Sequence, residues 1–231
     1  MSATSLPGQT TGPAATSRRE SLSLGTAAAV FWRRPTPWIL LGATLAAAAA
    51  RLLARGWTTT DLIIAGALVV GFPVMEWVIH VVLLHWRPRE VGGVTLDPLV
   101  SRKHRSHHAD PTNLDDVFIP LRTLVKAIAA TLLVGLVAFP RIELGLTYIA
   151  VQAALGTVYE WTHYLVHTEY RPRSWAYRQI WRNHRLHHYK NERYWFTVTS
   201  AGTADRLFRT YPRPADVPTS PTARSLHSEQ A

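Results

Sequence analysis

The chain has 231 residues, enough for one compact domain with its own core, and 25 basic against 15 acidic residues give it a formal charge of +10. It contains no cysteine, which excludes disulfides, thiolate metal sites and cysteine nucleophiles. Its basic residues flank apolar stretches and no nucleic-acid-binding motif accompanies them, so we expect no nucleic-acid partner.

The chain begins with a segment, 1–20, that is rich in Ser, Thr, Pro and Gly and has no apolar periodicity. Such a composition cannot bury enough apolar surface to fold, so we predict a disordered N-terminal tail there. A second disordered tail is predicted over 212–231, which opens with Pro212-Arg213-Pro214. The single domain is therefore expected over 21–211.

Four long apolar segments lie within that domain, each of roughly 17–25 residues, the length that a bilayer requires at about 1.5 Å per residue. They run from about Trp38 to Ala54, from Leu62 to Trp86, from Leu121 to Phe139 and from Leu144 to about His167. Each is apolar nearly all round, which favours membrane spans over the buried helices of a soluble protein. Short links make two helical hairpins of them, so the sequence predicts an all-α integral membrane protein.

Two charged and aromatic stretches, 87–120 and 168–211, follow the hairpins and hold most of the histidines. Basic residues accumulate on the cytoplasmic side of membrane proteins, so we expect both stretches to form a cytosolic helical cap, with the N-terminus on the same side. Arg51 and Arg55 in the opposite link oppose this orientation but are outnumbered. The Ala- and Arg-rich composition favours a multi-pass protein of a bacterial plasma membrane.

Ten of the eleven histidines fall into four tight groups. Two are pairs at span ends, His80-x4-His85 and His163-x3-His167. The other two have the form HxxHH and comprise His104, His107, His108, His184, His187 and His188. Residues at i, i+3 and i+4 share a helix face, so we predict that each HxxHH group converges on one point. His80 and His85 lie about 140° apart on an ideal helix, and we predict that the helix unwinds or bulges to bring them together.

Neutral imidazole is a good ligand for iron, zinc, copper and nickel. One tetrahedral zinc needs about four ligands, so ten histidines suit two ions with four or five each. One histidine near an apolar segment is usually a satisfied core residue, but that explanation does not extend to ten in matching groups. The sequence therefore predicts a histidine-ligated di-metal site between the spans and the cap.

Ligating histidines usually donate their second ring nitrogen to a carboxylate or a carbonyl. Glu76 precedes His80 by four residues and Glu160 precedes His163 by three, so both are placed for that role, with a plain hydrogen-bonded helix carboxylate as the alternative. Further candidates for the same role are Asn191, Asp110, Asn113 and Asp115. Four tryptophans are expected in an interfacial aromatic belt rather than in substrate contacts: Trp77, Trp86, Trp161 and Trp175.

The histidine groups resemble those of the fatty acid hydroxylase and sterol desaturase superfamily of membrane di-metal oxygenases, over about residues 60–211. The fatty acid 2-hydroxylases are the most similar branch. Its last box resembles the stretch His184-Arg185-Leu186-His187-His188-Tyr189-Lys190-Asn191, continued by Phe196, Val198-Thr199-Ser200, Asp205, Phe208 and Thr210. Its second box resembles His104 to His108 followed by Pro111 and Pro120.

The resemblance implies a four-span anchor under a cytosolic cap, with the ten histidines holding two iron ions; zinc is possible in isolated samples. It implies hydroxylation beside the carbonyl of a long acyl chain, free or in a ceramide-like lipid, with O2 as co-substrate. We expect no counterpart of the haem domain that is fused to some relatives. We therefore expect an external electron donor of the ferredoxin or cytochrome type.

The sequence departs from that branch at several positions. Trp195 and Thr197 stand where glycines are expected beside Phe196, and Asn113 and Asp116 replace Asp and Arg. If these positions line the lipid opening, the acyl length or head group differs, and Trp195 and Phe196 are candidate substrate contacts.

Two alternatives stay open. The segment from His163 through Arg173 to His188 is also similar to the carotenoid ring hydroxylases, so an oxygenase acting on a carotenoid ring or a sterol-type lipid is the first. A non-catalytic metal transporter or sensor is the second. Transport favours ligands strung through the membrane, whereas these histidines cluster at span ends and in the cap.

Overall fold

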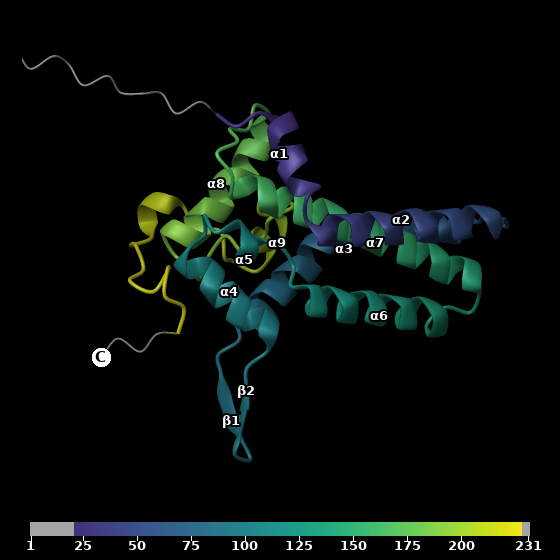
Figure 1. The fold of residues 1–231 in the computed structure, drawn as a ribbon, viewed down its shortest axis with the longest axis horizontal. Helices are drawn as coiled ribbons and strands as arrows, with labels where there is room; N and C mark the ends of the chain where they lie inside the picture. The colour runs from purple at the N-terminus through teal and green to yellow at the C-terminus, as the bar shows by residue number, and fades with distance from the viewer. Residues whose placement is uncertain (1–20, 228–231) are drawn as a thin grey trace, which may run out of the picture.

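The computed structural model describes residues 21–227 of the chain, and the N-terminal tail expected over 1–20 lies outside them. Four helical segments in the described part are long and apolar enough to cross a membrane. They are α2 (Pro35–Leu53), α3 (Thr59–Val78) continued by the π-helix η1 (Ile79–Leu84), α5 (Leu114–Val117) with α6 (Leu121–Val137), and α7 (Ile142–Val166). The predicted all-α membrane fold with two helical hairpins is confirmed (Figure 1).

α7 is the central span, because it packs against α2, α3 and α6. Its contact with α6 is closest at Gly135 and Gly145, where a side chain on either residue would collide with the opposite helix. Small residues let helix backbones approach in this way when no hydrophobic force drives association inside a bilayer. Large apolar side chains instead point outward from the spans, with Leu53 81% and Val70 79% exposed, as expected of a surface that faces lipid.

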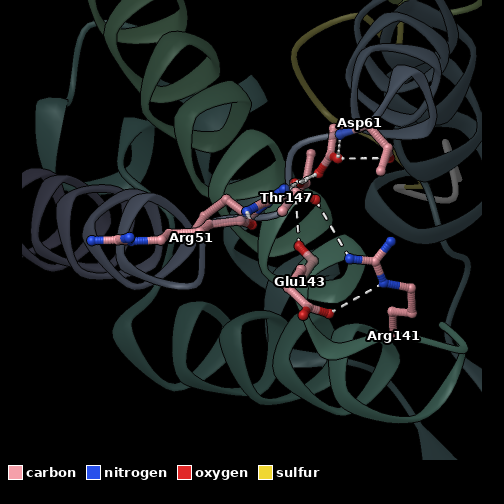
Figure 2. Close-up of polar contacts among 8 residues, drawn as sticks. Arg51, Asp61, Arg141, Glu143 and Thr147 are labelled. Carbon is pink, nitrogen blue, oxygen red and sulfur yellow. Dashed lines mark hydrogen bonds and ion pairs between the residues drawn. The ribbon is translucent and has the colours of Figure 1, made fainter.

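A buried ion pair lies at the end of the bundle where the two hairpins turn (Figure 2). The Arg51 guanidinium lies 2.9 Å from an Asp61 carboxylate oxygen and donates to Thr147 at 2.9 Å, and both charged residues are 1% exposed. The network joins α2, α3 and α7. Buried charges are tolerated when they are paired and hydrogen-bonded in this way. Arg141 donates to the carbonyl of Gly56 at 3.4 Å and so ties the two turns together.

The cap gathers at the other end of the spans, where α1 (Leu24–Phe31), α4 (Leu99–Ala109), α8 (Trp175–Tyr189) and α9 (Thr203–Leu207) surround the ends of α3 and α7 (Figure 1). Its apolar core joins α1, α5 and α7 and consists of Ala27, Phe31, Val117, Phe118, Tyr164 and Leu165. The Tyr164 hydroxyl donates to the carbonyl of Ala27 at 3.0 Å. The cap is therefore packed directly onto the histidine-bearing end of α7.

A short β-hairpin, β1 (Arg89–Val91) and β2 (Val94–Leu96), interrupts the otherwise helical fold and was not predicted. The strands are antiparallel and are joined by Gly92 and Gly93, whose φ values are 58° and 79°. Two successive residues with positive φ are the mark of a tight hairpin turn, and glycine adopts them without steric cost.

The prediction of a disordered tail over 212–231 does not hold for 212–227, which pack against the cap. This segment contains the short 3-10 helix η2 (Pro214–Asp216) and buries Val217, Ala223 and Leu226. The Ser220 N–H donates to the carbonyl of Lys190 at 2.7 Å, and Arg224 donates to the carbonyl of Ala109 at 2.7 Å. The segment thus satisfies carbonyls at the ends of α8 and α4, which a Pro- and Ser-rich composition does not reveal.

Candidate metal centre

Ten histidine side chains meet between the cap and the span ends in two groups of five. Site A consists of His80, His85, His104, His108 and His187. Site B consists of His107, His163, His167, His184 and His188. One nitrogen from each ring lies within 4.8 Å of the others in its site, and eight of the ten residues are buried. The count of five per site agrees with the expectation of four or five ligands for each of two ions.

The π-helix η1 brings His80 and His85 together. The His85 N–H donates to the carbonyl of His80 at 3.0 Å, a bond that spans five residues, and the two ring centroids lie 5.1 Å apart. Widening the turn from 3.6 residues rotates residues at i and i+5 toward one face. The distortion predicted from the five-residue spacing is therefore confirmed.

The HxxHH groups do not converge on one point, and that prediction is wrong. His104 and His108 of α4 lie in site A while His107 lies in site B; in α8, His184 and His188 lie in site B while His187 lies in site A. On a helix, residues at i and i+4 are about 40° apart, but the residue at i+3 lies about 100° from i+4. α4 and α8 therefore each give two histidines to one site and one histidine to the other. Sites A and B consequently have the same composition: two rings from one of these helices, one from the other, and two from a span end.

Four rings are oriented by backbone carbonyls. In site A, Nδ1 of His80 lies 2.6 Å from the carbonyl of Phe196, and Nδ1 of His108 lies 2.8 Å from that of Ala223. Nδ1 of His187 lies 2.8 Å from the carbonyl of Tyr194. In site B, Nδ1 of His163 lies 3.0 Å from the carbonyl of Val117. A carbonyl can only accept, so each Nδ1 carries the ring hydrogen. In a neutral imidazole the other nitrogen, Nε2, then presents a lone pair.

These Nε2 atoms point at one another. In site A, Nε2 to Nε2 distances of 3.1 to 3.2 Å connect His104, His108, His187 and their neighbours. Corresponding distances in site B are 3.0 to 3.1 Å. Two nitrogens that each bind one ion at about 2.1 Å, roughly 90–100° apart, lie about 3.0–3.2 Å from each other. The donor atoms, their tautomers and their spacing thus fit two metal ions.

The electrostatics of the sites favour the ligand form of histidine. Burial lowers the pKa of His187 to about 4. For His108, burial together with the neighbouring His187 ring holds the pKa well below the usual value. Both rings are consequently neutral at physiological pH, which is the state that binds a cation.

The two buried glutamates do not bond the histidines directly, and of the two roles left open for them the hydrogen-bonded carboxylate is the one that the structure shows. Glu76 accepts from the N–H groups of Val198 and Thr199 and from the Thr199 hydroxyl, at 3.1 Å for the Thr199 N–H and 2.6 Å for the hydroxyl. It therefore fixes the segment whose Phe196 carbonyl orients His80.

Glu160 repeats this arrangement at site B. Its carboxylate accepts from the N–H of Ile119 at 3.1 Å. Two residues earlier, the carbonyl of Val117 orients His163. Glu76 and Glu160 therefore play the same part. Each fixes a loop by accepting from its backbone N–H groups, and a carbonyl of that loop orients a histidine, His80 or His163, that lies about one helical turn after the glutamate.

The other polar candidates shape the loops around the sites. Asn191 donates to the carbonyl of Pro218 at 3.3 Å, so it attaches the C-terminal segment to the end of α8. Asp110 accepts from Thr112, Asn113 accepts from the N–H of Asp115, and Asp115 pairs with Arg34 at 2.6 Å. Among the described residues, their hydrogen bonds go to these partners and not to the histidine rings.

The segment after α8 presents Phe196 to site A. Its ring centroid lies 5.2 Å from that of His187 and 5.4 Å from that of His80. Trp195 is 1% exposed and has a φ of 57°, in the left-handed region that favours glycine, so its position explains the glycine expected there. Asp205 is the residue for which the sequence suggested no role: it accepts from the N–H groups of Phe196 and Thr197 at 2.8 and 3.0 Å.

The tryptophans expected in an aromatic belt have diverse surroundings. Trp77 donates to the Thr210 hydroxyl at 2.9 Å and stacks on Phe208 at 4.2 Å, so it ties the cap to α3. Trp161 packs against Phe31 at 4.9 Å, whereas Trp175 is 68% exposed.

Three cavities with shared lining residues lie between the interior of the span bundle and the two sites. The largest, about 520 Å³, lies among α2, α3, α6 and α7 and is lined almost wholly by apolar side chains such as Leu40 and Phe72. A second cavity, of about 250 Å³, shares Phe72 and Ile119 with it. The third, of about 50 Å³, shares Ile119 with both and is also lined by His104 of site A and His163 of site B.

The fold and the paired sites define a membrane protein with two histidine-lined candidate metal sites and, in its spans, an apolar cavity that shares a lining residue with the small pocket beside them. The sequence profile of the fatty acid hydroxylase family matches residues 65–210, and the chain belongs to this family of lipid hydroxylases. No curated protein matches the chain. Among solved structures, full-length Scs7p, of which only the hydroxylase domain is visible, is similar with a TM-score of 0.66 and 21% identity, over 80% of this chain and 68% of that chain.

Proposed function

We propose that the protein is a membrane di-iron oxygenase that hydroxylates a lipid acyl chain beside its carbonyl. The ten histidines of sites A and B are the proposed ligands, five for each ion. The observation that carries this proposal is the series of cavities that adjoins both sites, because His104 and His163 line the same small pocket. Membership of the fatty acid hydroxylase family supports the reaction class.

Two iron ions, when bound, supply the activation of O2 and the insertion of one oxygen atom into an unactivated C–H bond. Zinc has no redox chemistry, so zinc in an isolated sample marks replacement of the working metal. The carbonyl bonds to Nδ1 of His80, His108, His163 and His187 hold those rings in the orientation and tautomer that ligation requires.

The apolar cavity among the spans is the proposed acyl-chain site. Most of its lining side chains are apolar, and Gln152, Glu76 and Thr123 are among the few polar ones before Tyr159 and His163. Such walls favour an acyl chain over water. At the polar end of the small pocket, Lys103 pairs with Asp116 at 2.8 Å. A head group held there leaves the carbons beside the carbonyl next to the two sites, so the proposed product is a 2-hydroxy acyl lipid or fatty acid.

We further propose the setting in which the enzyme works. The catalytic domain consists of the predicted domain 21–211 together with the packed segment 212–227. Its cap and metal centre lie on the cytoplasmic side of a bacterial plasma membrane, as the distribution of basic residues favours. Electrons come from a separate donor of the ferredoxin or cytochrome type, and O2 is the co-substrate. The cap contains the exposed basic surface of α8, including Arg178 and Arg182, which suits an acidic redox protein.

The test is mass spectrometry of total lipids from a host that expresses the wild type or the His187→Ala variant together with a reductase and a ferredoxin. New 2-hydroxy acyl species in the wild type alone support the reaction and the site. Oxygen added to carotenoids or sterols instead would keep the metal centre and transfer the substrate to the alternative class. No oxygenated lipid in either sample, with the donor system active, would contradict the proposal.

A further inference from the structure

The β1–β2 hairpin projects from the body of the protein on the cap side of the spans (Figure 1). Its register pairs Arg89 with Leu96, Glu90 with Thr95 and Val91 with Val94. Paired residues share one face of a hairpin, and successive residues along a strand alternate between faces. One face therefore carries Arg89, Val91, Val94 and Leu96, and the other carries Glu90 and Thr95, whose side chains bond at 2.6 Å.

The apolar face of the hairpin is open. Within the described part of the chain, the side chains of this face have large solvent-accessible fractions: 56% for Val91, 61% for Val94 and 44% for Leu96. A lone two-stranded hairpin with three-residue strands is marginally stable in water. An amphipathic pair of strands of this kind is stabilised when its apolar face has a partner.

The base of the hairpin is fastened to α4. Arg105 donates to the carbonyl of Trp86 at 3.2 Å and to the carboxylate of Asp97 at 2.6 Å, so one guanidinium holds both ends. Trp86 in turn donates to the carbonyl of Leu96 at 3.1 Å, and the Arg89 guanidinium lies 4.6 Å from the centre of its ring. The hairpin is thus fixed in direction relative to the helix that carries His104.

We propose that this apolar face rests on the lipid bilayer at the level of the head groups. The face continues a surface that already meets lipid, because the span ends at Leu84 and its side chains Val82 and Leu83 are exposed just before Trp86. Tryptophan prefers the membrane–water interface, and an arginine beside it extends its guanidinium toward the phosphates.

The charges of the hairpin indicate which lipid head groups it contacts, and its unpaired backbone groups limit how deeply it enters the bilayer. The exposed cations Arg87 and Arg89 match a surface with anionic head groups. Open strand edges cannot enter the hydrocarbon core, where their N–H and C=O groups would lack partners. The hairpin therefore lies in the interface with Glu90 and Thr95 turned toward water.

The absence of native cysteine allows a direct test with single-cysteine spin labels. Val94→Cys and Thr95→Cys place labels on adjacent residues of opposite faces, and Val91→Cys with Glu90→Cys repeats the comparison on the other strand. Each variant of the full chain is placed in nanodiscs of phosphatidylcholine and phosphatidylglycerol. Its accessibility to O2, which concentrates in lipid, is then compared with that to a water-soluble nickel chelate.

We expect the labels at 91 and 94 to favour O2 and those at 90 and 95 to favour the nickel chelate. Equal access to the nickel chelate on both faces would overturn the proposal. Spin–spin broadening at 94 that disappears on dilution with unlabelled protein would also overturn it, because a second copy of the chain would then cover the face. Because the readout is independent of turnover, it stands whether or not the proposed reaction is correct. An unchanged helical circular dichroism spectrum shows that each variant is folded.

Discussion

His108 of α4 and His187 of α8 direct their Nε2 atoms at each other across 3.2 Å, while each ring donates its Nδ1 hydrogen to a backbone carbonyl. Neither Nε2 can then carry a hydrogen if the rings are neutral, so two lone pairs face each other in a buried space. Such an arrangement is unfavourable unless a cation lies between them. This contact therefore ties the packing of the two cap helices to metal binding.

Replacing single ligands should remove activity and reduce iron. His187→Ala in site A and His163→Ala or His107→Ala in site B should each reduce hydroxylation to background and lower the iron content from about two ions per chain, since each ligand belongs to one site. The measurement is elemental analysis together with lipid mass spectrometry. His227→Ala is the matched control, because this histidine bonds the carbonyl of His85 and belongs to neither site. Normal activity in all three ligand variants would refute the assignment.

The two glutamates should act on different ions. Glu76→Gln should weaken site A and Glu160→Gln should weaken site B, each by on the order of 10–100-fold in metal affinity, because each carboxylate holds the loop that orients one ligand. Titration with a competing chelator, followed by elemental analysis, gives the two affinities. We expect one high-affinity and one low-affinity metal ion in each variant, with the low affinity at site A in Glu76→Gln and at site B in Glu160→Gln. This opposite pattern distinguishes the role from a general loss of folding. Equal loss from both sites in both variants would contradict it.

Acidification should release the C-terminal segment. Burial alone would raise the pKa of Glu192, but hydroxyl donors from Thr222 and Ser220 at 2.7 and 3.0 Å hold it below its usual value. A carboxylate with a lowered folded-state pKa stabilises the packed form above its unfolded pKa of about 4.3, and this contribution is lost as the pH falls through the lower folded value. The protection factors of residues 217–223, which are exchange rates corrected for the intrinsic rate at each pH, should therefore fall below about pH 4. Glu192→Gln should already have low protection factors in this segment at neutral pH. Wild-type protection factors that do not change with pH would disprove the linkage.

Filling the large cavity should shorten the accepted acyl chain. Ala153 lines the cavity among the spans, so Ala153→Phe places a ring in the proposed chain path. We expect the product distribution to shift toward shorter chains, with metal content unchanged. Ala129→Phe on the exposed side of α6 is the control, since this residue faces outward. An identical chain-length profile in wild type and Ala153→Phe would exclude this cavity as the acyl site.

The sequence was sufficient for the features that depend on spacing along one helix. Span lengths and the five-residue gap between His80 and His85 predicted the four spans and the distorted helix end, because both follow from helical geometry. The geometry of one helix also accounts for the division of each HxxHH group into a pair and a single ring, because the residue at i+3 lies about 100° from that at i+4. It does not say which site receives which ring. That allocation depends on how α4 and α8 lie relative to each other.

Other features depend on contacts between distant segments. Glu76 lies four residues before His80, yet its partners are Val198 and Thr199, more than a hundred positions away. The packed segment after Tyr211 is held by carbonyls at the ends of two helices, and its own composition carries no periodicity. In both cases the backbone, rather than the side-chain pattern, supplies the hydrogen-bonding groups.

The pair of Arg51 and Asp61 has a consequence for how the protein enters its membrane. In the orientation proposed above, the turn between α2 and α3 must be translocated together with the charges on either side of it, Arg51 at the end of α2 and Asp61 at the start of α3. Crossing together, they are a neutral pair, whereas α2 alone would expose an uncompensated guanidinium to the hydrocarbon. We therefore expect the first helical hairpin to insert as one unit. Thr147 of α7 would join the network only after the second hairpin has been synthesised.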